Sequence, residues 1–212
     1  KADIHNGLYE YGATGLSLKD LELNANLANR VIALTGSGAG AEGGRVTLNG
    51  RLAEDEAGVT VNLDRLLVYD RMGDIARLSG EAKLTEGAKD RVLSGDLKID
   101  EARFNVENFS NNSIRTLNVR WTTDDPDAQR AAVLRKPIRL DLGVTAQRGV
   151  FVTGRGLNSD WALDIDVTGR PDSLLLKGRA TLVRGTLELA QRPFEFESGR
   201  ITFDGPIDSA QM

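Results

Sequence analysis

Apolar and polar residues alternate along most of this chain. Near its end, the stretch VRGTLELAQRPFEFESGRITFDG contains apolar pairs at Leu187 and Leu189, Phe194 and Phe196, and Ile201 and Phe203. A side-chain period of two is the period of a β-strand, so each pair shares one face of a sheet and the polar residues take the other. The same alternation in earlier segments predicts an all-β fold.

The alternation changes phase at several points, which predicts bends within strands. Between Leu18 and Leu21 the apolar positions shift by one residue, as they do at a β-bulge. The stretch LDRLLVYDRM from Leu63 also fits a short helix, but its neighbours are strands and we expect a strand. We expect a turn around Asp55 to Gly58.

One segment lacks strand alternation. In TDDPDAQRAAVLRKP, Asp125 suits the N-cap of a helix, Pro126 its first turn, and Pro137 its end. We therefore expect one short helix at about residues 126–135. The acidic residues Asp124 and Asp127 fit helix capping better than calcium binding, since the spacing of an EF-hand is missing.

A short motif recurs along the chain. LSGEAKL from Leu78, LSGDLKI from Leu93 and LKGRATL from Leu176 share apolar ends and a central glycine. The copies that begin at Leu93 and Leu176 continue with the same offsets and the same phase slip, which predicts stacked, similar strands. The glycine lies on the apolar face. There it marks either a bend or close backbone approach, which we favour, or a recess in the apolar surface.

Composition and charge narrow the function classes. The chain has 212 residues, a net charge of −4 without a basic stripe, and no cysteine. Nucleic-acid binding is therefore disfavoured, and disulfides and thiolate metal sites are excluded. No apolar run is long enough to span a bilayer, and the first residues do not form a signal peptide. We expect residues 1–212 to form a single elongated unit within a longer chain, with any membrane anchor outside it.

Motifs for catalysis or cofactor binding are weak, and we expect no cofactor and no enzyme activity. VIALTGSGAGAEGG from Val31 has the glycine spacing of a dinucleotide site. That site needs a helix after the glycines, and the strand-like RVTLNG follows instead, so we expect a loop between two strands. His5 is the only histidine and has no supporting catalytic or metal-binding residues. Asp164 and Asp166 share a strand face, where a glycosidase or lyase pair is less favoured than a solvated strand face.

From Val150 to Gly205 the chain resembles the C-terminal domain of the TamB family. The matching pieces are GRGL from Gly154, the turn from Val167 to Pro171, LVRGTLEL, RPFEFESGRITFDG, and earlier LSGDLKIDEARFNV. The likeness is looser from residue 58 to residue 109. Within LNSDWALDI, Trp161 and Ala162 stand where the family pattern favours a glycine.

The resemblance implies a curved β-sheet folded like a taco around an open groove with an apolar interior. It implies a periplasmic location, as part of a protein anchored in the inner membrane. It also implies phospholipid acyl chains as the guest, a TamA-like outer-membrane barrel as partner, and outer-membrane proteins as possible clients.

The apolar positions of the alternating segments are the expected groove lining. They are Leu78, Leu84, Leu97, Ile99, Phe104, Val106, Leu182, Leu187, Leu189, Phe194, Phe196, Ile201 and Phe203.

Two other function classes stay open. The chain could be a scaffold for assembly of outer-membrane proteins, in which an exposed sheet edge near Ile201 to Ile207 adds a client strand. An enzyme built on a β-solenoid would need a polar cluster, for which Asp164 and Asp166 are the best available pair.

Overall fold

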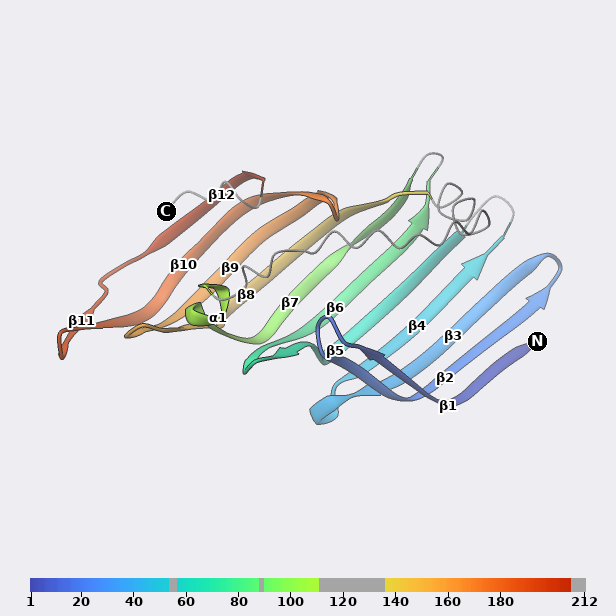
Figure 1. Cartoon of the computed structure of the whole chain (residues 1–212). Coiled ribbons are helices and arrows are strands. Elements are labelled where there is room, and N and C mark those ends of the chain that lie inside the picture. The colour runs from blue at the N-terminus through green and yellow to red at the C-terminus, as the bar shows by residue number, and fades with distance from the viewer. Residues whose placement is uncertain (54–56, 88–89, 111–135, 207–212) are drawn as a thin grey trace, which may run out of the picture.

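The structure, a computed structural model, describes residues 1–53, 57–87, 90–110 and 136–206 (Figure 1). Nearly all of these residues lie in strands, and the predicted all-β, elongated open sheet is confirmed. The elements are β1 (Ala2–Tyr11), β2 (Leu16–Ala28), β3 (Val31–Gly40), the 3-10 helix η1 (Ala41–Gly43), β4 (Arg45–Leu52), β5 (Ala57–Arg71), β6 (Asp74–Glu86), β7 (Arg91–Asn105), α1 (Val106–Ser110), β8 (Ile138–Gly154), β9 (Leu157–Arg170), β10 (Ser173–Leu189), β11 (Arg192–Glu195) and β12 (Arg200–Pro206).

One 12-stranded sheet contains all of the described strands. Neighbours in sequence pair antiparallel from β1 to β7 and from β8 to β11, whereas β7 and β8 pair in parallel. At the far end, β11 pairs with residues 186–189 of β10 and β12 pairs with residues 175–181. Figure 1 shows the strands side by side, from β1 at the N-terminal end to β11 and β12 at the opposite end.

The register aligns apolar residues in rows that cross the sheet. Cross-strand partners point to the same face of a sheet, so each row belongs to one face. One row consists of Ile4, Leu23, Gly36, Leu48, Val61, Ala82, Gly95, Leu142, Val167, Leu176 and Gly205. A second consists of Leu34, Gly50, Val59, Leu84, Leu93, Leu140, Gly169 and Leu174. A third consists of Gly38, Val46, Leu63, Gly80, Leu97, Val144, Ile165, Gly178 and Phe203.

The intervening row lies on the opposite face and is polar or charged, apart from one glycine. It consists of Ser37, Thr47, Asn62, Glu81, Asp96, Gly143, Asp166, Lys177 and Asp204. Across these rows the sheet therefore has one apolar and one polar face.

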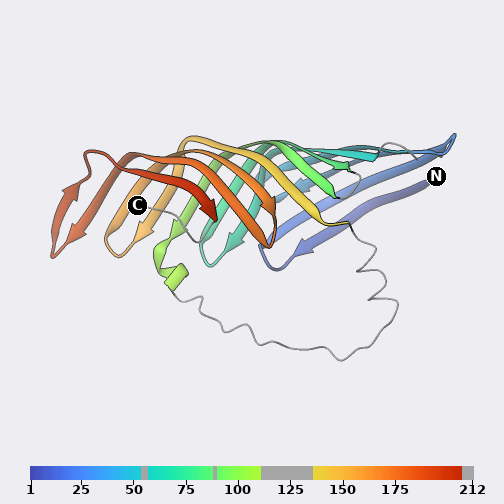
Figure 2. The ribbon, with the colours of Figure 1, turned by 90° about the horizontal axis from the view of Figure 1, so that it is seen from above.

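A line of β-bulges bends the sheet along its middle. The register shifts near residue 20 in β2, residue 65 in β5, residue 100 in β7, residue 148 in β8 and residue 183 in β10. Each bulge bends its own strand, and because the shifts lie at matching levels they align into one crease. Figure 2 shows the resulting arch, with the strand ends on the same side of the molecule.

The apolar face lies inside this bend. Side chains on the inner side of a bent sheet converge, so small residues there become the most buried. Ala102, Ala146 and Ala180, all on the apolar face beside the crease, are 1%, 3% and 4% exposed. The folded sheet therefore forms a groove with an apolar interior.

The crease divides the groove into two walls. We call the side that contains Leu93, Leu142 and Leu176 the long wall, and the side that contains Ala76 and Leu187 the short wall. The short wall lacks β3 and β4, because their connection through η1 lies at the level of the crease. The N–H of Asp70 donates to the carbonyl of Thr14 at 2.8 Å, which joins the β1–β2 turn directly to β5 across this gap.

The predicted phase shifts are confirmed as bulges. Asp20 has a φ of 49° where the β2–β3 register shifts. The slips after Ile99 and after Leu182 both coincide with register shifts, in β7 and β10. The stretch from Leu63 is the strand β5, as predicted. The expected helix at residues 126–135 lies outside the described residues, as does the core of the expected turn near Asp55.

Helix α1 corrects the prediction that Val106 continues a strand. The side-chain Oδ1 of Asn105 accepts the N–H of Glu107 at 2.9 Å. An Asn side chain in this role caps a helix N-terminus and satisfies a donor that the ladder no longer uses. The strand β7 therefore ends at Asn105, and Val106 begins α1.

The glycine-rich stretch from Val31 corrects a second prediction in part, because strand β3 continues through the glycines to Gly40 and the connection to β4 is limited to residues 41–44. Its glycines face the groove beneath neighbouring leucines. A Cβ at Gly36 would lie 2.5 Å from Leu23 Cδ2, and one at Gly38 would lie 2.7 Å from Leu21 Cδ2. Glycine is needed here to make room for larger side chains from β2.

The repeated glycines mark close backbone approaches, as favoured from the sequence. Gly80, Gly95 and Gly178 have φ values of 137°, 154° and 139°. A Cβ on any of them would come within 2.2 Å of a carbonyl oxygen on the adjacent strand. These positions combine a backbone conformation that only glycine tolerates with a contact that only glycine permits.

Gly178→Ala should lower the free energy of unfolding by about 2–4 kcal/mol, since it adds both backbone strain and a clash with the carbonyl oxygen of Asp164. Urea denaturation followed by far-UV circular dichroism measures this change. The matched control is Gly12→Ala in the β1–β2 turn, where a Cβ meets nothing within 4 Å. The control should stay within about 1 kcal/mol of the parent chain, and equal effects of both changes would refute the close-approach explanation.

Candidate functional site: an open apolar groove

The structure places every residue of the expected groove lining on the inner face of the bend. Leu84, Leu97 and Phe203 belong to the apolar rows of the long wall. Leu187 pairs with both Leu157 and Phe194 on the short wall. The others on this face are Leu78, Ile99, Phe104, Leu182, Leu189 and Ile201.

Two residues reach the groove from outside the ladder. Val106 of α1 lies over Gly154, where a built Cβ would be 2.9 Å from Val106 Cγ2. Phe196, between β11 and β12, lies over Gly185, and its N–H donates to the Gly185 carbonyl at 2.9 Å.

The floor of the groove is a cluster of small residues at the crease. Ala102, Ala146 and Val150 are buried, and Trp161 and Leu163 are among the side chains that pack against them. The indole N–H of Trp161 donates to Ser159 Oγ at 2.9 Å, and Ser159 Oγ donates to the carbonyl of Val152 at 3.0 Å. Trp161 is thereby fixed in β9, which runs unbroken through the residues that depart from the family pattern.

Above this floor the groove is open. Among the described residues, no large side chain is more than 98% buried. Leu189 and Phe194 are 55% and 52% exposed, although both point to the apolar face. Apart from α1 over Gly154, no described element forms a second layer on this face. A large exposed apolar surface is unusual for a soluble protein and marks a site of interaction.

Two polar side chains at the crease, the buried Asp160 and the half-buried Ser79, bind its backbone. Asp160 is 5% exposed, and its Oδ1 accepts the N–H of Gly149 at 2.8 Å, in the bulge of β8. Ser79 Oγ accepts the N–H of Arg65 at 2.8 Å, in the bulge of β5, and donates to Asp100. A bulge leaves a backbone group unpaired by the ladder, and these side chains bind it. The alternation gives no signal for these roles, which require knowledge of which strands are neighbours.

Charged residues line the outer side of the crease. Arg77 pairs with both Glu42 and Glu101, and Glu101 also pairs with Arg103. This network links the β3–β4 connection, β6 and β7 across the outside of the bend. The chain thus stabilises the crease with apolar contacts inside and ion pairs outside.

The carboxylate pair considered for catalysis lies on the polar face. Asp164 and Asp166 are exposed, and Asp164 pairs with the likewise exposed Arg179 at 3.7 Å. Within the described ranges no group of His, Cys, Asp or Glu side chains is arranged to hold a metal ion. No helix in the same ranges is long and apolar enough to cross a membrane.

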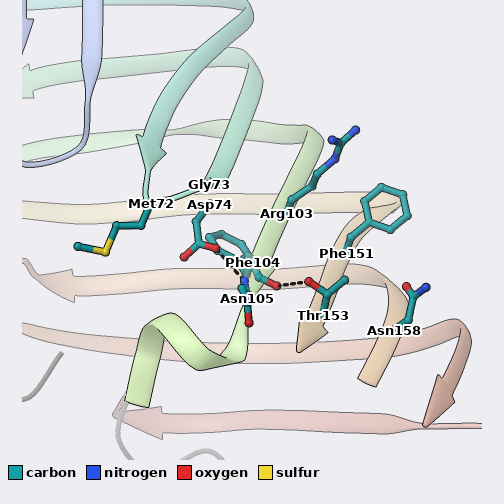
Figure 3. A pocket seen from close by; sticks show the side chains of 9 residues that line it. All are labelled: Met72, Gly73, Asp74, Arg103, Phe104, Asn105, Phe151, Thr153 and Asn158. Atoms are coloured by element: carbon teal, nitrogen blue, oxygen red, sulfur yellow. Dashed lines mark hydrogen bonds between the residues drawn. The ribbon is translucent and has the colours of Figure 1, made fainter. Parts of the chain in front are cut away.

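A cleft of about 450 Å³ lies at the end of the short wall, beside the β5–β6 turn (Figure 3). Asp74 Oδ1 accepts the N–H of Asn105 at 2.7 Å, and Thr153 Oγ1 donates to the carbonyl of Phe104 at 3.5 Å. These bonds use the polar groups of the cleft to hold β7 against its neighbours. A second cleft of about 640 Å³ lies near the junction of β9, β10 and β11, and it includes Phe151, Asp160, Arg184 and Phe196.

A single bent sheet with an apolar inner face and no catalytic constellation in its described part defines an open β-groove protein. The family model of the TamB C-terminal domain matches residues 34–212, and the chain therefore belongs to the TamB family. Comparisons with curated proteins and with solved structures found no match. The family match extends well beyond the segment in which the sequence resemblance is most specific.

Asp160→Ala should lower the free energy of unfolding by about 1–3 kcal/mol, because it leaves the part-buried N–H of Gly149 without an acceptor. Asp160→Asn keeps an acceptor oxygen and should lose less. Asp164→Ala is the control, since its exposed ion pair contributes little, and it should change stability by less than about 0.5 kcal/mol. Chemical denaturation of the three variants measures these changes. Equal losses of stability for Asp160→Ala and Asp164→Ala would contradict the role of Asp160 as acceptor for the N–H of Gly149.

Proposed function

We propose that this chain shields and conducts phospholipid acyl chains along its groove. In this proposal it acts in the periplasm, between the inner and outer membranes, as part of a module with a TamA-like barrel protein. Family membership supports the location and the partner. The observation that carries the proposal is the set of apolar rows without a charged residue, one of which continues from β1 to β12 and the other two from β3 to β10 or β12.

The direction of these rows suits a path. Neighbouring strands lie about 4.8 Å apart, so the rows extend about 50 Å across the sheet. A guest that moves along a row meets the same kind of surface at each strand. Ligand pockets for a single small molecule are instead closed and carry a few convergent polar groups.

The energetics favour an acyl chain as guest. Burial of a methylene group gains about 0.8 kcal/mol, so a chain of roughly sixteen carbons gains on the order of 10 kcal/mol before ordering costs. That gain needs no polar recognition, which agrees with an inner face made of Leu, Val, Ile, Ala, Phe and Gly. The exposed apolar surface is unfavourable in water, and a guest removes this cost.

Site-specific photocrosslinking in cells tests this proposal. A photoreactive residue at Leu187 or Leu97 should yield phospholipid adducts, because both positions face the groove. The outward neighbours Glu188 and Lys98 are matched controls on the same strands and should yield none. Protein adducts alone at Leu187 and Leu97, or equal lipid adducts at all four positions, would refute the lipid path.

Strand addition at the open edge is the second candidate function, and the geometry of β12 favours it. No other described strand pairs with β12 beyond β10. The N–H of Leu182 donates to the carbonyl of Gly199 at 2.8 Å. Hydrogen-bonded pairs alternate in an antiparallel ladder, so Ile201 and Phe203 bond to β10, whereas Thr202 and Asp204 direct their N–H groups outward. This edge can therefore accept a strand from a client or from the barrel partner.

The double change Thr202→Pro and Asp204→Pro removes both outward N–H groups and leaves the bonds to β10 in place. It should abolish crosslinking of β12 to protein partners and preserve lipid adducts at Leu187. The control is the double change to alanine, which keeps both N–H groups. Unchanged protein crosslinks in the proline variant would remove the support for strand addition.

A further inference from the structure

The two walls of the groove differ in the chemistry of their side chains. All three tyrosines of the chain, Tyr9, Tyr11 and Tyr69, lie on the groove side of the short wall. Phe104 lies beside Tyr69, with ring centroids 6.5 Å apart, and Phe194 continues the series on β11. On the long wall, Phe203 is the only aromatic residue among the described groove-facing positions.

The two rims also differ in how their cations are paired. At the long-wall rim, Glu86 binds both Arg91 at 2.9 Å and Lys136 at 2.8 Å, and hydrogen bonds from Lys136 and Arg91 lower the pKa of Glu86. Further along this rim, Arg139 pairs with Asp90 and Arg170 with Asp172. Arg30 is an exception, without an ion pair among the described residues.

Arginines at the short-wall rim have different partners. Arg71 ends β5 at the β5–β6 turn, and Arg192 begins β11 after the β10–β11 turn. Arg71 donates to the backbone carbonyls of Gly12 and Ala13. Within the part of the chain that the structure describes, no carboxylate pairs with Arg71 or Arg192. Arg192 pairs with Leu189 in the ladder and so starts from the groove side.

Together these differences indicate how an amphiphile lies across the groove. Tyrosine rings favour the interface between hydrocarbon and water, because they are apolar with a polar tip. Arginine binds phosphate through paired N–H donors. A wall of aliphatic residues and glycine suits hydrocarbon alone.

We propose that phospholipids bind in one orientation, with the phosphate at the short-wall rim, the glycerol ester region along the tyrosines, and the acyl chains against the long wall. This inference rests on the proposed function and adds a polarity to the groove. Lipids that move along the groove would then keep their headgroups on one rim.

Tryptophan quenching by spin-labelled phosphatidylcholine tests the orientation. In a background of Trp121→Phe and Trp161→Phe, the change Phe194→Trp reports on the short wall and Phe203→Trp on the long wall. Both positions lie on the last strands of the sheet and both changes replace one aromatic ring by another. The 212-residue chain is loaded from vesicles that carry the label at the headgroup, at the fifth acyl carbon or near the acyl chain end. The vesicles are then removed by sedimentation, so that only lipid carried by the protein quenches.

The three label positions are compared within each variant. Phe194→Trp should be quenched about twofold more by the headgroup label than by the chain-end label, and Phe203→Trp should show the opposite order. The same order in both variants, or a reversed one, would overturn the orientation while leaving the lipid path intact. No quenching by any label in either variant would overturn the proposed function itself, and the orientation with it.

The native Trp161 gives a second readout that introduces no new residue into the groove. In the single variant Trp121→Phe, Trp161 at the crease should be quenched most by the label at the fifth acyl carbon, because the chains cross the crease on their way to the long wall. Strongest quenching by the chain-end label would mean that chain ends fill the crease from both rims, and would overturn the proposal.

Arg192→Gln tests the phosphate contact. It should reduce the retained dioleoyl phosphatidylglycerol about threefold and leave the retention of dioleoylglycerol, which lacks phosphate, unchanged. Arg170→Gln is the matched control at the opposite rim and should change neither. Equal loss of both lipids, or an equal effect of the two arginine changes, would refute a phosphate site at Arg192.

Discussion

The register of the backbone ladder is the constraint on which the rest of this structure depends. In a strand, a slip of one residue moves every side chain to the other face. The apolar rows are continuous because the register pairs Leu, Val, Ala and Gly with one another on the same face, as in the row from Ile4 to Gly205. Where one strand inserts a residue, its neighbour shifts at the same level, as β7 and β8 do near residues 100 and 148. The groove is therefore a property of pairing between strands and not of any one segment.

The bend imposes its own requirements on the residues at the crease. On the inside, converging side chains bury small residues such as Ala102 and Ala146. Within the strands, extra residues free backbone N–H groups, which Ser79 and Asp160 bind. On the outside, Arg77 links two carboxylates across neighbouring strands. Apolar packing, hydrogen bonds to the bulges and ion pairs thus all stabilise the crease. The sheet on either side of it needs only the regular alternation of apolar and polar residues.

The alternation could predict the strands and most of the bends, because both are local properties of sequence. Leu18 and Leu21 reveal a bulge by their spacing alone, and the repeated motif reveals similar strands at Gly95 and Gly178. The prediction of a loop at the glycines of β3 is wrong for a physical reason. Gly36 and Gly38 look like a loop in isolation, but they accommodate leucines of β2 that only the fold brings near. Residues far apart in the sequence also determine the roles of Asp160 and Ser79 and the parallel pairing of β7 with β8. The same holds for the pairing of both β11 and β12 with β10.

The placement of polar groups explains why a groove of this kind has no single centre. A catalytic site gathers polar side chains at one point of a concave surface. Here the buried polar residues Asp74, Ser159 and Asp160 bind backbone or neighbouring side chains that hold the sheet in shape. The inner face is left with apolar surface whose chemistry changes little from strand to strand. The kind of side chain changes instead across the groove, from aliphatic residues on one wall to tyrosines and arginines on the other. A surface that is uniform along its length and graded across its width can orient an amphiphile without fixing its position, which is the physical requirement for movement along a path.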